Sequence, residues 1–223
     1  MNIWDILVLD RSASMLSKKN SLREGYNNLV SEQIKQGSKS KFTVYAFNTI
    51  VDIIKDEVFP NVSELHEDEF NTFGCTALLD AVGNVYDTIL QNTEYEKINI
   101  TIITDGMENS SKFYTIQLLD DKRKELDKHF NINLTFIGAD MHCLRNNTLL
   151  PHVLHSVNCE GDMVQAMKTA SRTMSSTRED SEYIPEGKVE INPNDSKLPI
   201  LKRQHSSVNP PFLSQCDKFC RLN

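Results

Sequence analysis

The chain has 223 residues, 31 acidic and 24 basic side chains, and a formal net charge of −7 at pH 7. This length allows one ordinary domain with additional material. The acidic balance argues against nucleic acid and anionic membranes as partners, and no apolar run approaches the ~20 residues of a membrane span.

The cysteines indicate the compartment in which the protein works. Their number is odd, and their spacing is not that of a disulfide framework: Cys75, Cys143, Cys159, Cys216 and Cys220. Such usage is typical of a reducing compartment. The first predicted strand begins at Ile3, which leaves no room for a signal peptide. We therefore expect a cytoplasmic protein.

The first element is a continuous apolar strand that begins at Ile3 and runs into a polar turn. An apolar run of this length is typical of a central strand buried on both faces. The turn carries Asp10, Ser12 and Ser14 at the strand's carboxyl end, where open α/β sheets bind their ligands. Alternate residues of a tight loop can turn their oxygens toward one point, which suits a hard divalent cation. The alternative is that these residues cap a helix or close a turn.

A helix and a hairpin follow this turn. Apolar residues recur at helical spacing between residues 21 and 36, on a face made of Leu22, Tyr26, Leu29, Val30 and Ile34. Residues 42–47 and 50–54 are predicted strands, and their short connection predicts an antiparallel hairpin at the sheet edge. Residues 62–70 are predicted to form a short helix or an irregular segment.

The middle of the chain alternates helix and strand. Thr76 lies in a loop before a helix with an apolar face of Leu78, Ala81, Val82, Val85 and Ile89. Residues 98–103 form a buried strand that ends at Thr104-Asp105-Gly106. Residues 108–111 are expected to cap the following helix, whose predicted inward face is Ile116, Leu119, Leu126 and Phe130. Residues 120–124 of that helix are expected to be solvated.

The remaining elements complete an α/β pattern. Strands are predicted at 132–137 and 153–157, with a short helix at 144–150 between them, and a last helix has its inward face at Met163, Val164, Met167, Ala170 and Met174. This alternation predicts a Rossmann-like, doubly wound, mostly parallel sheet with one antiparallel edge strand. Five of the seven prolines lie in residues 178–223, which we expect to be a disordered tail after a domain of residues 1–177.

Three segments together resemble the metal-ion-dependent adhesion site of von Willebrand factor A domains. Asp10-Arg11-Ser12-Ala13-Ser14 matches the first segment of that site, Thr76 in Phe73-Gly74-Cys75-Thr76 matches the second, and Asp105 in Thr104-Asp105-Gly106 matches the third. All three occur in the expected order, beside the expected strands and helix. The resemblance covers residues 1–177 and implies the von Willebrand A fold.

The resemblance also implies a function and a ligand set. Ser12, Ser14 and Thr76 would bind Mg²⁺ or Mn²⁺ directly, with Asp10 and Asp105 acting partly through water. An Asp or Glu of a protein partner would complete the coordination shell. The chain would then be a metal-dependent protein-interaction module, not an enzyme, and is expected to be a monomer. Arg11 and Glu108 are candidates for a partner-binding rim, with Glu108 more often a helix N-terminal carboxylate.

Three other hypotheses stay open at this point. A Mg-dependent hydrolase or phosphotransferase could use Asp10 as its nucleophile, although Ser12 stands where similar phosphatases have a second Asp. A metal-free scaffold could have the same fold. A zinc site could use ligands from the segment after residue 140, although their spacing matches no established pattern: His142, Cys143, His152, His155 and Cys159.

Overall fold

Six strands form one sheet in the computed structural model, which describes residues 2–92, 94–138 and 153–179. The strand order is β3-β2-β1-β4-β5-β6. Every neighbouring pair is parallel except β2 and β3. Their bounds are β1 Ile3–Asp10, β2 Lys41–Phe47, β3 Val51–Val58, β4 Lys97–Thr104, β5 Asn131–Gly138 and β6 His155–Asn158. The predicted α/β class and its antiparallel edge strand are therefore confirmed.

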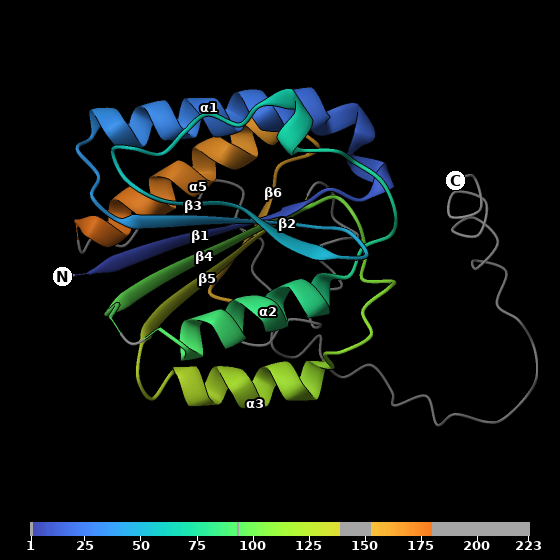
Figure 1. The fold of residues 1–223 in the computed structure, drawn as a ribbon, viewed down its shortest axis with the longest axis vertical. Coiled ribbons are helices and arrows are strands. Elements are labelled where there is room, and N and C mark those ends of the chain that lie inside the picture. Colours follow the sequence, from blue (N-terminus) through green and yellow to red (C-terminus); the bar gives the residue numbers. More distant parts are fainter. Residues whose placement is uncertain (1, 93, 139–152, 180–223) are drawn as a thin grey trace, which may run out of the picture. The chain divides into compact units, whose positions relative to one another are not determined.

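Helices cover both faces of this sheet. Figure 1 shows α1 and α5 together on one face and α2 and α3 on the other. The bounds are α1 Lys19–Lys35, α2 Leu78–Leu90, α3 Ile116–Leu126 and α5 Met163–Arg178, with short 3₁₀ helices η1 at Ala13–Lys18 and η2 at Glu67–Glu69. None of the described helices is long and apolar enough to cross a membrane.

Alternation along the central strand creates two separate cores. Leu7 and Leu9 of β1 belong to the cluster that contains the buried faces of α1 and α5. Ile6 and Val8 belong to the cluster that contains α2 and α3. Successive side chains of a strand point to opposite faces, so the part of β1 that contributes to both cores, Ile6–Leu9, is apolar.

Three predictions about helix faces were wrong. Ile34 and Ile116 were expected to face inward, but they are 38% and 39% exposed, at the last turn of α1 and the first turn of α3. Arg123 was expected to be solvated, but it is only 6% exposed. Its guanidinium donates to the Ile132 carbonyl at 2.8 Å and to the Asp127 carboxylate at 2.8 Å, and these partners compensate its burial.

The strand order reverses direction between β1 and β4. From β1 the chain proceeds outward to β2 and β3, and from β4 it proceeds outward to β5 and β6 on the other side. The carboxyl ends of β1 and β4 therefore flank the topological switch point, where open α/β sheets form a crevice for ligands. Asp10 is the last residue of β1, and Asp105 directly follows β4.

We expect a chain that ends after Glu179 to keep its melting temperature within about 2 °C, because the described elements end at Arg178. A chain that ends after Thr177 should melt about 2–4 °C lower, the shift for a loss of about 1 kcal/mol. It lacks Arg178, whose guanidinium lies 3.9 Å from the buried Asp5 carboxylate and donates to Ser38. Calorimetry of both chains makes the comparison, and a fall above about 10 °C in the longer one would show that the tail packs on the domain.

Candidate metal centre

Asp10 is held in place at the end of β1 by two hydrogen bonds. The residue is 0% exposed. Its Oδ1 accepts the backbone N–H of Ser12 at 2.7 Å, and its Oδ2 accepts the Thr104 hydroxyl at 2.5 Å. Thr104 can reach it because β1 and β4 pair in parallel with Leu9 opposite Ile103. The register of two strands thus fixes the first carboxylate of the predicted site.

The two serines connect this carboxylate to the second one. The Ser12 and Ser14 hydroxyl oxygens lie 3.0 Å apart. Ser14 donates its hydroxyl to Asp105 Oδ1 at 2.6 Å. The sequence separates Ser14 and Asp105 by 91 residues, so the fold brings the first and third predicted segments together.

Backbone hydrogen bonds place the Thr76 loop beside the same turn. Ala13 donates its N–H to the Gly74 carbonyl at 3.0 Å, and Thr76 donates its own N–H to Asn109 Oδ1 at 2.9 Å. Gly74 has φ +73°, and a Cβ there would lie 3.3 Å from the Thr49 hydroxyl. This left-handed conformation favours glycine, which explains the residue type at this bend of the loop.

The space next to Gly106 shows that three of the predicted ligands converge. A Cβ on Gly106 would lie 2.9 Å from Thr76 Oγ1, 3.5 Å from Asp10 Oδ2 and 3.7 Å from Ser14 Oγ. One point is therefore surrounded by oxygens of the first and second predicted segments, and Gly106 itself belongs to the third. We call this space the Gly106 cradle.

Burial sets the electrostatics of the cradle. Loss of hydration raises the pKa of Asp10 to about 6, against the lowering effect of its hydrogen bonds from Thr104 and Ser12, and the nearby Asp105 carboxylate raises it further. Asp105, whose side chain is 3% exposed, accepts a hydrogen bond from Lys18 Nζ at 2.5 Å. Two buried carboxylates at close range repel each other, so a cation in the cradle would be stabilised.

The donor set fits a hard divalent cation. It consists of two carboxylates and three hydroxyls, which are the oxygen ligands that Mg²⁺ prefers. No three His, Cys, Asp or Glu side chains in the described ranges gather where they could hold a metal, so the hydroxyls are essential to any site here. Of the suggested zinc ligands, His142, Cys143 and His152 lie outside the described residues, and the Cys159 thiol bonds to the Gly138 carbonyl.

Comparison with solved structures adds evidence on the fold. A von Willebrand factor type A protein from Catenulispora acidiphila superposes with TM-score 0.56 at 12% identity, over 79% of this chain and 42% of that one. The ArnB paralog VWA2 from Sulfolobus acidocaldarius superposes with TM-score 0.54 at 18% identity, over 76% and 44%. The chain has the von Willebrand factor A fold.

Other comparisons limit the conclusions that this structural similarity supports. The PilB minor pilin from Streptococcus sanguinis superposes with TM-score 0.60 at 15% identity, over 82% of this chain and 62% of that one. The chain thus spans less than two thirds of each of these structures. No protein-family model and no curated protein sequence matches it. Structural similarity at such low sequence identity establishes the von Willebrand A fold, but it gives no evidence on the site.

Arg11 lies within the Asp10–Ser14 loop, but its side chain points to the edge of the von Willebrand A sheet. It is 7% exposed and its guanidinium pairs with Asp52 of β3. The guanidinium carbon lies 6.0 Å from the centre of the Phe73 ring. These contacts hold β3 and the Phe73 loop to the Asp10–Ser14 loop. A role of Arg11 at a partner-binding rim stays a prediction.

Glu108 caps a different helix from the one expected. Its Oε2 accepts the N–H of Leu79, in the first turn of α2, at 2.9 Å, and its Oε1 accepts the N–H groups of Ser110 and Ser111 at 3.0 and 2.8 Å. The expectation that residues 108–111 cap the following helix was wrong, because Thr115 caps α3. A negative charge at a helix N-terminus is favourable, and Glu108 thereby fixes the loop after Asp105 to the helix after Thr76.

Sequence reasoning missed two residues that shape the site. Thr104 belongs to the recognised Thr-Asp-Gly segment, and its place opposite the end of β1 could have shown that its hydroxyl reaches Asp10. Lys18 gave no comparable signal, because 87 residues separate it from Asp105.

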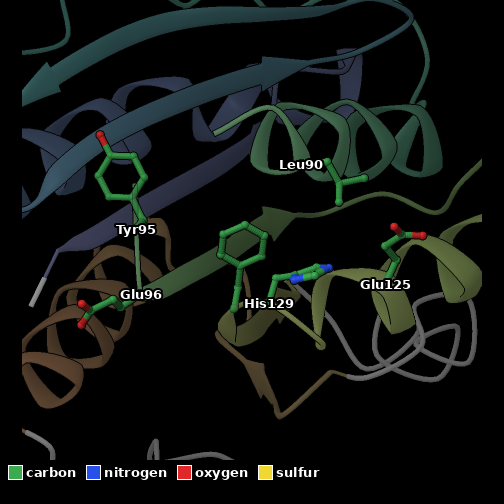
Figure 2. Close-up of a pocket in the computed structure, with 6 residues that line it drawn as sticks. Leu90, Tyr95, Glu96, Glu125 and His129 are labelled. Carbon is green, nitrogen blue, oxygen red and sulfur yellow. The ribbon is translucent and has the colours of Figure 1, made fainter. Parts of the chain in front are cut away.

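A cavity of about 560 Å³ lies away from the candidate metal centre, between the ends of α2 and α3 and the start of β4. It is lined by Leu90, Tyr95, Glu96, Glu125, His129 and Phe130. Figure 2 shows Glu96 and Glu125 on either side of His129, well apart from each other. No predicted site residue lines this cavity.

Proposed function

We propose that this protein is a protein-interaction module that binds its partner through a Mg²⁺ or Mn²⁺ ion. Ser12, Ser14 and Thr76 would hold the ion directly, and Asp10 and Asp105 would balance its charge, partly through water. The observation that supports this proposal most is the Gly106 cradle, where oxygens of Asp10, Ser14 and Thr76 face one point beside the third segment, at the switch point of the sheet.

The ligand chemistry explains why such an ion would attract a partner. Neutral hydroxyls leave most of the charge of a divalent cation uncompensated, so a further coordination position favours an anionic oxygen. An exposed Asp or Glu of a partner supplies that oxygen. The ion is thus the bridge, and this chain's residues orient it and keep one side of it open.

Exposed apolar side chains close to the site favour a protein as the partner. Leu16, Phe73 and Met107 are 68%, 48% and 55% exposed. Leu16 lies two residues after Ser14, Phe73 three residues before Thr76, and Met107 two residues after Asp105. Apolar groups beside a charged centre are typical of the core of a protein interface.

The proposal is tested by partner capture from the native source. Capture should fail in chelator, return with Mg²⁺ or Mn²⁺, and return less well with Ca²⁺, which is larger and takes more ligands. Asp105→Ala should reduce capture at least about tenfold, because it removes one of two charges that balance the ion. Asp121→Ala, an exposed position on α3, is the matched control. Capture that ignores both chelator and Asp105→Ala would contradict the proposal.

The hydrolase alternative predicts a different result. Pure protein with Mg²⁺ would then turn over phosphoester substrates, and Asp10→Asn would abolish that turnover. We expect no turnover, because both carboxylate oxygens of Asp10 already accept hydrogen bonds, from Ser12 and Thr104, and Ser12 stands where similar phosphatases have a second Asp.

The location and the oligomeric state remain our sequence-based predictions, a cytoplasmic monomer. The likeness to a pilin and to a pilus adhesin from Lactobacillus rhamnosus GG favours the cell surface as the alternative. Fractionation of the native cells distinguishes the two locations, and light scattering of the pure protein measures its mass.

A further inference from the structure

Lys18 places a positive charge inside the candidate metal centre. It is the last residue of η1, and its Nζ donates to Asp105 Oδ2 at 2.5 Å. The Asp105 side chain is 3% exposed and that of Lys18 is 26% exposed, so this contact is shielded on the carboxylate side and open to water on the lysine side.

The neighbouring cations have other partners. Arg11 pairs with Asp52, and Lys19 Nζ reaches Asn71 Oδ1 at 3.4 Å. Within the described ranges, Lys18 is the cation that pairs with a carboxylate of the site. It therefore compensates part of the repulsion between Asp10 and Asp105 when no metal is present.

A divalent ion and this ammonium group compete for the same carboxylate. Two cations at close range repel each other strongly in a poorly hydrated site. Once the ion binds Asp105, the ammonium group is repelled by the ion and no longer pairs with the carboxylate. Lysine has a flexible four-carbon stem and a strongly hydrated head, and the exposure of Lys18 gives that head a route to water.

We propose that Lys18 is a tethered cation that holds Asp105 without metal and leaves it when the metal binds. Lys18 thereby sets the metal concentration at which the site fills. This inference rests on the proposed function, because it requires that a metal binds. A consequence is that metal binding frees an ammonium group beside the partner-binding position.

The first test is calorimetric titration of Mn²⁺ and Mg²⁺ into the full chain and two variants. Lys18→Met should bind at least about tenfold more tightly than the wild type, because the competitor is gone. Lys19→Met, at the adjacent half-buried lysine, should stay within about twofold. Lys18→Gln replaces Lys18→Met if the latter melts at a lower temperature. Equal affinities of the wild type and the Lys18 variants would overturn the inference and leave the proposed function standing.

The second test follows the Lys18 amine in the wild type by chemical labelling and mass spectrometry. Lys18 should react several-fold more slowly than Lys19 in chelator, and Mg²⁺ should remove the difference. Equal reaction of both lysines in chelator would overturn the inference. A protected Lys18 that Mg²⁺ does not release, together with no heat of binding in any variant, would instead contradict the proposed function.

Discussion

We expect Gly106→Ala to reduce the affinity for Mg²⁺ and Mn²⁺ at least about a hundredfold, about 2.7 kcal/mol, while the protein stays folded. The new methyl group would lie 2.9 Å from Thr76 Oγ1 and 3.5 Å from Asp10 Oδ2. It therefore fills the space between the Thr76, Asp10 and Ser14 oxygens. Mg²⁺ requires near-ideal octahedral geometry, so it cannot adapt to a shifted ligand.

This substitution separates metal binding from folding. Gly106 is not among the glycines with positive φ, so alanine is compatible with its backbone. No charge and no ligand is removed. Met107→Ala is the matched control, because it changes the adjacent exposed side chain and should alter the affinity by no more than about twofold. Wild-type affinity in Gly106→Ala would place the metal elsewhere.

Asp80→Ala is expected to lower the free energy of unfolding by about 3–5 kcal/mol, because a hydrogen bond to a charged group contributes about 1.5–3 kcal/mol and Asp80 accepts several. Asp80 is 5% exposed in the first turn of α2. Its carboxylate accepts the backbone N–H groups of Lys112, Phe113 and Tyr114 at 2.8–2.9 Å. Removing it leaves these three backbone donors without the carboxylate.

Denaturant unfolding measures this loss. Asp121→Ala on α3 removes an exposed carboxylate that bonds only to a neighbouring glutamine among the described contacts, and should cost less than about 0.5 kcal/mol. A similar small loss in Asp80→Ala would show that the loop of residues 107–114 does not depend on α2. Because that loop follows Asp105, we also expect weaker metal binding in Asp80→Ala.

The sequence predicted the elements whose signal is local. A nearly continuous apolar run identified β1, because a central strand buried on both faces is mainly apolar. Strand β4 was identified by its isoleucines, Ile98, Ile100, Ile102 and Ile103. The short connection after Phe47 identified the antiparallel edge strand. Helical periodicity identified the buried faces of α2 and α5, where all predicted apolar positions except Val164 are buried.

The missed features depend on contacts between distant segments. Periodicity finds a helix face, but it does not show where the neighbouring layer ends, so Ile34 and Ile116 were wrongly placed inside. Arg123 could be buried only because the Ile132 carbonyl lies within its reach. Glu108 was assigned to the next helix in the chain, whereas the fold places it against the first turn of α2.

The candidate site was predicted residue by residue from its three short segments. The structure brings Asp10, Ser12, Ser14, Thr76 and Asp105 together. The sequence could not show that Lys18 contacts Asp105, since a contact between a 3₁₀ helix and the end of a distant strand has no fixed sequence spacing.

Calorimetric titration of Mn²⁺ into the wild type, Thr76→Ala and Asp10→Ala tests directly whether this cluster binds a divalent metal. We expect one site in the wild type, weaker binding in Thr76→Ala, and the weakest binding in Asp10→Ala, because that variant loses a charge as well as an oxygen. The metal-free protein should stay folded, with a gain on binding of about 2.7 kcal/mol at a hundredfold excess over the dissociation constant. Equal, weak heats in all three proteins would contradict the account.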